Sequence, residues 1–320
     1  MRRFEVAILG SSGLVSQRLQ ELLYDHPFFD VVAIAGSPQN VGSMYDEIEW
    51  RLDSPRPNYD ILICSMSDIP DVDIAFSALP SNVAEIVEPS LVARGIHVFS
   101  NASAFRRIAG IPLVIPEVNP EDMRNYDGHA CATNCTVVPV VTPIIGLKNL
   151  GIKSISIYTR QALSGAGWQL LNDKNALEGN VNPFIPGEEE KLIAELKYLL
   201  DLDIQVNASC NRVSQKDGHM VSVSLQVQQN TDLETVKRLM KINRLNLPSS
   251  PEVVNYIIDE KPNRDEHLWI GNGMSITVGN IQVKGKTITF DALSHNTVRG
   301  AAGGVILLAE FAVKKAYITK

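Results

Sequence analysis

The sequence predicts a two-domain α/β protein, a doubly wound parallel sheet followed by an α+β domain. Three observations carry this prediction. An apolar run at the start leads through a glycine turn into a helical pattern. Strand and helix patterns then alternate up to about residue 133, and later strands alternate polar with apolar residues. We expect one domain to comprise 1–133 with 298–320, and the other 134–297.

The first strand and turn are typical of a Rossmann-type nucleotide-binding fold. Phe4–Leu9 is apolar, and leucines at helical spacing follow the turn Gly10-Ser11-Ser12-Gly13. Gly10 permits a tight turn, Gly13 lets the backbone approach a pyrophosphate, and the helix N-terminus favours an anion. Ser16 stands where the third glycine of the motif is usual. The predicted cofactor-binding residues here are Gly10, Ser11, Ser12, Gly13, Leu14 and Val15.

The end of the second strand, Val31–Ala35, bears on the choice of cofactor. In such folds an acidic residue there binds the ribose of NAD, and an Arg accommodates the 2′-phosphate of NADP. This chain has neither and instead carries Ser37, Gln39 and Asn40. Because these side chains can hydrogen-bond a phosphate, the pattern favours NADP and leaves NAD possible.

Further βα units complete the first domain. Asp73–Pro80 is a strand that ends in a turn of small residues, Val83–Ala93 suits a helix, and Ile96–Phe99 is another strand. Leu113–Ile115 and the residues before Cys131 extend the alternation. Since ligands bind at the carboxyl ends of parallel strands, Ser77 and Leu79 are also expected to face the cofactor.

Composition excludes several classes of partner. The chain has 320 residues, 45% hydrophobic and 20% charged, enough for two domains with their own cores. Its net charge of −7 and pI near 5.4 argue against nucleic acid and anionic membranes. We find no signal peptide and no run of membrane-spanning length, and therefore expect a cytoplasmic protein that acts on a small molecule.

Among few cysteines, Cys135 is the candidate nucleophile. The four cysteines, Cys64, Cys131, Cys135 and Cys210, form no CxxC pair, so we expect reduced thiols and no metal site. Polar Asn134-Cys135-Thr136 precedes the apolar run Val137–Ile145, which predicts a thiol at the start of a buried helix. A helix N-terminus lowers the pKa of a cysteine and favours the reactive thiolate.

The second half reads as an open sheet with helices on one face. Ile152–Tyr158, Met220–Val227 and Thr287–Leu293 are strands that alternate, which favours mainly antiparallel pairing. Helices are expected at Glu188–Leu200 and from Gly300 through Ala312. One face of this sheet lacks enough helices to cover it, so we expect it to be buried against a second copy, in a homodimer or homotetramer.

A nicotinamide-binding fold with one activated cysteine points to aldehyde chemistry. Thiolate addition turns an aldehyde into a hemithioacetal, which can lose hydride and become a thioester with an activated acyl group. A histidine suits the accompanying proton transfer. His219 is the best placed, since it follows the turn Asp217-Gly218 and precedes a strand. For His26, His97, His129 and His267 a structural role is the simpler interpretation.

Along nearly its whole length the sequence resembles aspartate-semialdehyde dehydrogenase of the archaeal and fungal type. The resemblance rests on several short runs taken together. These are 10–13, 77–81, 103–106, 134–136, 161–167, 187–191, 211–213 with 218–219, and 296–303.

The resemblance implies roles for individual residues. Cys135 would be the nucleophile, with Asn134 holding the phosphate or the oxyanion. Gln161 would orient the covalent intermediate, and His219 would be the general acid/base. The residues implied for the substrate are Glu188 for the amino group, Arg212 for the carboxylate, and Arg106 and Lys191 for phosphate. Those that would complete the cofactor site are Ser164, Gly165 and Asn296.

The implied reaction is the reversible, NADP-dependent conversion of L-4-aspartyl phosphate to L-aspartate 4-semialdehyde and inorganic phosphate, for lysine, threonine and methionine synthesis. Gln39 and Ser43 stand where related sequences often have Arg and Lys. A malonyl-CoA or succinyl-CoA reductase shares this scaffold and is the nearest alternative, although Asn134, Arg106 and Lys191 favour an acyl phosphate. A catalytically inactive relative is a further alternative.

Overall fold

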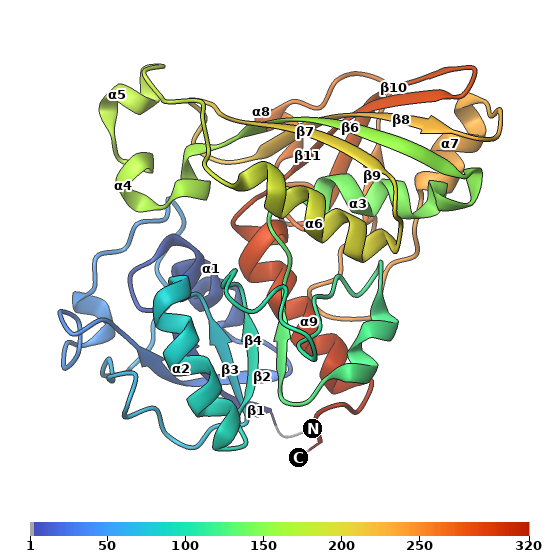
Figure 1. The fold of residues 1–320 in the computed structure, drawn as a ribbon. Coiled ribbons are helices and arrows are strands. Elements are labelled where there is room, and N and C mark those ends of the chain that lie inside the picture. Colours follow the sequence, from blue (N-terminus) through green and yellow to red (C-terminus); the bar gives the residue numbers. More distant parts are fainter. Residues whose placement is uncertain (1–2, 320) are drawn as a thin grey trace.

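The computed structural model describes residues 3–319 and divides into two layered bodies (Figure 1). The first contains, within those residues, a five-stranded sheet of order β2-β1-β3-β4-β5 with parallel pairing throughout. Its strands are β1 (Phe4–Leu9), β2 (Phe29–Ala35), β3 (Ile74–Ser77), β4 (His97–Ser100) and β5 (His129–Cys131). The strand order reverses between β1 and β3, which places a ligand crevice beyond Leu9 and Ser77.

Helices cover this parallel sheet, which confirms the predicted Rossmann-type class. They are α1 (Leu14–Leu23), α2 (Ser81–Ala93) and the C-terminal α9 (Gly303–Lys314). Figure 1 shows α9, in red, reaching from the upper body into the lower one. Its buried residues, such as Ile306 and Leu308, share a core with Ile8 and Phe76. This shared core supports the proposal that 298–320 belongs with 1–133.

The second body is built on a six-stranded mixed sheet of order β7-β6-β8-β11-β10-β9. Its strands are β6 (Ile152–Gln161), β7 (Gln205–Arg212), β8 (His219–Val227), β9 (Asn255–Ile257), β10 (Ile276–Lys284) and β11 (Thr287–Ser294). The three inner pairings are antiparallel, as expected, but β7 and β9 pair in parallel at the two edges.

The three helices α3 (Val138–Ile144), α6 (Glu188–Leu200) and α7 (Leu233–Met240) lie along one face of this sheet (Figure 1). Their apolar side chains share a core with the inward residues of the strands, for example Leu196 with Ile155 and Val223. Short α4 (Trp168–Leu171) and α5 (Lys174–Leu177) project as a lobe beside the first body, and α8 (Arg264–His267) precedes β10. Three acidic residues open α6, where the helix dipole favours them.

Several predicted elements differ from the structure. Leu113 contributes an isolated bridge to Cys131, not a strand, because only one residue pairs there. The C-terminal helix begins at Gly303 and is preceded by a π-helical turn at Val298–Ala302. Most importantly, α3 begins at Val138, so Cys135 lies in the turn before the helix and not in its first turn.

Candidate active site

The turn after β1 is shaped by backbone and small side chains. Gly10 has a φ of +117°, which a residue with a Cβ rarely adopts. Ser16 is buried, and its hydroxyl donates to the Gly10 carbonyl. This hydrogen bond explains why serine replaces the third glycine of the motif, because the Ser16 side chain stabilises the turn.

The N-terminus of α1 fits the pyrophosphate of a dinucleotide. Its N-cap, Gly13, provides no side-chain cap for the first N–H groups, and nothing lies closer than 3.9 Å to the position of a Cβ there. These N–H groups are therefore free to donate hydrogen bonds to an anionic ligand. Ser12, Leu14 and Val15 belong to the same segment.

Polar side chains at the ends of β2 and β3 flank this turn. The Asn40 amide donates to the Ser11 hydroxyl over 2.9 Å, and exposed Ser37 begins the loop between them. Ser77 ends β3 in the interior, with Leu79 two residues beyond. The crevice is polar and uncharged at Ser37, Asn40 and Ser77, and apolar at Leu79.

On the far side of the crevice, Asn296 links two loops of the second domain. Its amide nitrogen donates to the Ser164 hydroxyl over 2.8 Å, and its amide oxygen accepts from the Gly218 N–H over 2.8 Å. Gly218 directly precedes His219, and Gly165 directly follows Ser164. The residues predicted for the cofactor in this domain are therefore tied to the residues predicted for catalysis.

Cys135 is tightly enclosed by backbone. A Cβ on Gly300 would lie 2.6 Å from the Cys135 Cβ and 3.0 Å from its Cα. Only glycine fits at residue 300 without moving the cysteine. On the other side, Asn134 shapes the turn by accepting hydrogen bonds from the N–H and hydroxyl of Thr136 over 2.8 and 2.6 Å.

Glu188, the first residue of α6, gathers the polar side chains around this turn. Its Oε1 accepts from Asn134 Nδ2 over 3.0 Å, from Gln161 Nε2 over 3.2 Å and from Thr136 Oγ1 over 3.3 Å. Within residues 3–319, Glu188 Oε2 receives no hydrogen bond from Asn134, Thr136 or Gln161. The carboxylate thus orients three neighbours through one oxygen and keeps the other for a ligand.

The backbone of one residue, Ala162, positions both His219 and Arg212. The Ala162 N–H donates to His219 Nδ1 over 3.1 Å, and the Ala162 carbonyl accepts from Arg212 Nη1 over 2.6 Å. Because Nδ1 is an acceptor, a neutral His219 carries its hydrogen on Nε2. Nε2 is buried and has no partner within the described part of the chain, and both groups approach Gly165.

The pKa of the Cys135 thiol contradicts the expected activation by a helix. Burial and, to a lesser extent, the negative charge of Glu188 raise this pKa to about 12, although Arg106 and Arg212 act in the opposite direction. The expectation was wrong because burial, together with the charge of Glu188, outweighs the two arginines, and because α3 begins three residues later. Burial also lowers the pKa of His219 well below its usual value, with Arg212 and Arg264 adding to the effect. His219 is therefore neutral at physiological pH.

The proposed phosphate residues are less closely grouped. Arg106 Nη2 donates to the Asn101 carbonyl over 2.7 Å, and its Nη1 contacts Glu195 Oε1 over 3.3 Å. Lys191 lies on α6 one turn after Glu188, but no contact in residues 3–319 joins its ammonium to Arg106. Arg106 is thus bound to α6 through Glu195, whereas Lys191, on the same helix, does not contact Arg106.

Sequence reasoning missed Glu195, Thr136 and Gly300. Glu195 is buried, at 3% exposure, and lies seven residues after Glu188 on the same face of α6. That spacing was a signal, but charged residues on a helix usually face solvent.

In the described residues no helix has the length and apolarity of a membrane span, and no group of three metal-ligand side chains forms.

Comparisons with known proteins agree with this arrangement. Residues 5–126 match the family model for the semialdehyde dehydrogenase NAD binding domain, and residues 141–299 match the semialdehyde dehydrogenase dimerisation domain. Fold and site thus define a two-domain semialdehyde dehydrogenase with a cysteine at the domain junction.

Full-length relatives narrow the family. Aspartate-semialdehyde dehydrogenase of Archaeoglobus fulgidus is 39% identical, covering 99% of this chain and 100% of the relative. The Aspergillus fumigatus enzyme of that name is 35% identical over 97% of both chains. Malonyl CoA reductase (NADP) of Metallosphaera sedula is 32% identical over 100% of this chain and 99% of the relative.

A solved structure of aspartate semialdehyde dehydrogenase with NADP from Candida albicans has a TM-score of 0.85 at 29% identity. It covers 99% of this chain and 100% of that chain. The chain belongs to the aspartate-semialdehyde dehydrogenase family, which confirms the resemblance found in the sequence.

Proposed function

We propose that the protein is an NADP-dependent aspartate-semialdehyde dehydrogenase. It reduces L-4-aspartyl phosphate to L-aspartate 4-semialdehyde and releases inorganic phosphate, a reversible step toward lysine, threonine and methionine. The observation that carries the proposal is the arrangement around Cys135. Glu188 orients Asn134 and Gln161 there, and the backbone N–H and carbonyl of Ala162 hold His219 and Arg212.

Buried charges would recognise the two ends of the amino acid. Glu188 Oε2 receives the substrate ammonium, and the guanidinium of Arg212 binds the carboxylate with the N–H groups that Ala162 does not use. Both side chains are more than nine-tenths buried, so a substrate lacking either charge leaves one of them uncompensated. Malonyl-CoA has no ammonium, which favours the aspartyl substrate over the alternative.

The covalent chemistry follows from the enclosed thiol. Cys135 Sγ attacks the acyl carbon, the bond from that carbon to the phosphate oxygen breaks, and phosphate leaves with the thiol proton. After hydride reaches the thioester carbon, the carbonyl reforms, the carbon–sulfur bond breaks, and the thiolate takes up a proton from solvent. When bound, the nicotinamide cofactor supplies this hydride.

His219 acts on the substrate oxygen. Its Nε2–H is the unpartnered donor of the ring and is aimed at the space beside Arg212 and Gly165. A hydrogen bond from Nε2 stabilises negative charge on that oxygen during attack and hydride transfer. We assign to His219 this hydrogen bond from Nε2 in place of a proton transfer, since Nδ1 is occupied by the Ala162 N–H and a neutral ring that lost the Nε2 proton would be an imidazolate.

NADP is the proposed cofactor, because the end of β2 offers Ser37 and Asn40 and no acidic residue that would repel a 2′-phosphate. The Candida albicans structure, which contains NADP, supports this choice. The N-terminus of α1 would hold the pyrophosphate, as its uncapped N–H groups fit it.

We further propose a cytoplasmic homodimer or homotetramer. The face of the second sheet that lies away from α3 and α6 carries Ser156, Tyr158 and Ser222 and forms a shallow hollow of about 550 Å³. Tyr158 is 48% exposed there. The match of residues 141–299 to a dimerisation domain supports pairing through this domain. Light scattering at micromolar concentration should give at least twice the 35.1 kDa chain mass; a monomer would contradict it.

The deciding experiment compares substrates with the purified protein. Oxidation of L-aspartate 4-semialdehyde with phosphate and NADP is measured beside NADPH-dependent reduction of malonyl-CoA and succinyl-CoA. We expect the semialdehyde reaction to have a kcat/KM at least about 100-fold higher, since the buried charges match only that substrate. A faster reaction with malonyl-CoA would establish the alternative, and no turnover with any of them would indicate an inactive relative.

A further inference from the structure

Glu195 occupies a junction that the proposed mechanism does not use. It lies on α6, two turns after Glu188, and its side chain is almost completely buried. Oε2 accepts from the Asn134 backbone N–H over 2.7 Å, and Oε1 contacts Arg106 Nη1 over 3.3 Å. A single carboxylate thus connects the residue before the nucleophile to the arginine proposed to bind phosphate.

The two donors come from different parts of the molecule. Arg106 belongs to the loop after β4 in the first domain, whereas Asn134 begins the turn that leads into the second. Glu195 reaches both from the second domain. Because both partners are donors, the site requires an acceptor on each oxygen, which a carboxylate provides and an amide does not.

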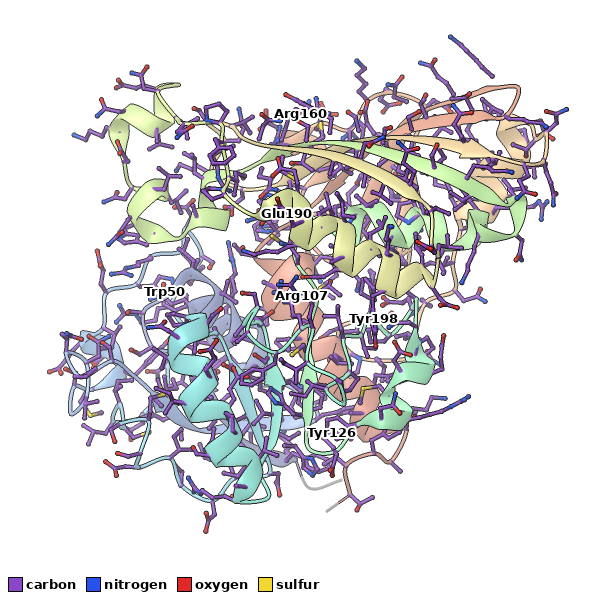
Figure 2. All side chains as sticks on the ribbon, viewed as in Figure 1. Trp50, Arg107, Tyr126, Arg160, Glu190 and Tyr198 are labelled. Carbon is purple, nitrogen blue, oxygen red and sulfur yellow. The ribbon has the colours of Figure 1, made fainter. Side chains whose placement is uncertain are left out.

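Arg106 lies where a ligand can reach it. A pocket of about 350 Å³ opens between the loop after Arg106 and α6, and both Arg106 and Glu195 line it. Figure 2 shows Arg107 and Tyr198 in this region, between α6 and the first domain. Arg106 Nε and both polar side-chain atoms of Asn101 are buried without partners in the described part of the chain. Arg106 Nε and Asn101 Nδ2 are donors and suit an oxyanion, whereas Asn101 Oδ1 is an acceptor and Asn101 does not line the pocket.

We propose that Glu195 is a positioning residue that holds Arg106 for phosphate and the Cys135 turn for attack in one arrangement. The inference rests on the proposed function, in which Arg106 binds phosphate. It assigns no direct contact with substrate to Glu195. The negative charge of Glu195 weakens the attraction of the site for phosphate, but the orientation that it gives the Arg106 guanidinium has the larger effect.

The test compares Glu195→Gln with Glu190→Gln. Glu190 lies on the same helix but is exposed, so it is a matched control for loss of one negative charge (Figure 2). In Glu195→Gln the amide nitrogen must oppose one of the two donors. We expect the KM for phosphate to rise about tenfold, while the KM for the semialdehyde changes less than twofold. The control should match the unmodified protein.

A second measurement does not depend on turnover. The alkylation rate of Cys135 by iodoacetamide is followed against pH, with the modified peptide identified by mass spectrometry. Since Arg106 lowers the pKa of this thiol, its displacement in Glu195→Gln should shift the alkylation profile to higher pH. A purely structural role lowers the melting temperature and leaves this profile in place.

The outcomes separate the two proposals. An unchanged phosphate KM together with an unchanged alkylation profile would overturn the role of Glu195. A lower phosphate KM would also overturn it, because Glu195 would then act only as a competing charge. If no semialdehyde is turned over but the alkylation profile still shifts, the proposed function fails and the positioning role stands.

A variant that retains both acceptor oxygens covers the case in which Glu195→Gln does not fold. Glu195→Asp is one methylene shorter and draws Arg106 back from the pocket. We expect a phosphate KM raised about threefold and a smaller shift of the alkylation profile in the same direction. A phosphate KM equal to that of the unmodified protein in Glu195→Asp would contradict the proposal.

Discussion

The two ends of the site, at the Gly10–Gly13 turn and at Cys135, differ in the chemical groups that face the ligand. At the turn, the ligand-facing groups are backbone N–H groups and the turn's own side chains are small and uncharged, while Arg51 donates to the Ser12 carbonyl from outside the turn. Around Cys135, four charged side chains, Arg106, Glu188, Glu195 and Arg212, are largely buried. The first end tolerates change in its side chains, whereas the second depends on every charge having its partner.

The largest expected effect is at the nucleophile. Cys135→Ser replaces the thiol with a much weaker nucleophile, so kcat should fall more than about 10³-fold. Steady-state rates of semialdehyde oxidation measure it. Cys64→Ser is the control, because that thiol lies in the first domain beside the Ile34 carbonyl, and it should stay within about twofold. Near-normal turnover by Cys135→Ser would rule out covalent catalysis.

The enclosure of Cys135 gives the next largest effect. In Gly300→Ala the new methyl group would lie 2.6 Å from the Cys135 Cβ, so the turn must move. A displacement of this size should lower kcat about 100-fold and slow alkylation of Cys135, with little change in cofactor KM. If kcat and the alkylation rate of Cys135 were both unchanged, the turn would accommodate the methyl group without displacing the thiol, which would contradict this prediction.

The same substitution at the cofactor end should do less. Gly13→Ala places its methyl 3.9 Å from Ser16 at an ordinary φ of −73°, so the melting temperature should not change. The methyl group does occupy the approach of the pyrophosphate, and the KM for NADPH should rise about tenfold with kcat nearly constant. If kcat fell as far as in Gly300→Ala, the two ends would not differ as described.

The smallest effect is expected from adding a charge. Gln39 is exposed after β2, and Gln39→Arg offers a 2′-phosphate a guanidinium in place of neutral donors. The kcat/KM for NADP should rise about three- to tenfold, and that for NAD should stay the same. In the unmodified protein, a higher kcat/KM for NAD than for NADP would contradict the cofactor assignment but not the reaction.

Sequence patterns predicted best the elements that their own residues determine. Phe4–Leu9 and Glu188–Leu200 have the same bounds in the sequence pattern and in the structure, because a buried strand and an amphipathic helix carry local periodicity. Strand β7, Gln205–Arg212, was not predicted. Its polar residues become a strand through parallel pairing with β6, a contact far away in the sequence.

The catalytic end was predictable in its residue types but not in its electrostatics. The motif around Cys135 identified the thiol, yet its raised pKa depends on burial and on Glu188, which the chain supplies from α6. For the same reason Glu195 was missed, since no local pattern shows which carboxylate of a charged helix turns inward.

The order of these pieces along the chain has a consequence for synthesis. Arg106 and Cys135 leave the ribosome before α6, and the turn containing Gly300 is among the last segments made. The thiol is therefore translated well before the residues that enclose it, and a chain interrupted between Cys135 and α6 contains the nucleophile without its site. Protection of Cys135 from alkylation thus reports that translation has reached the C-terminal helix and that this helix has packed against the first domain.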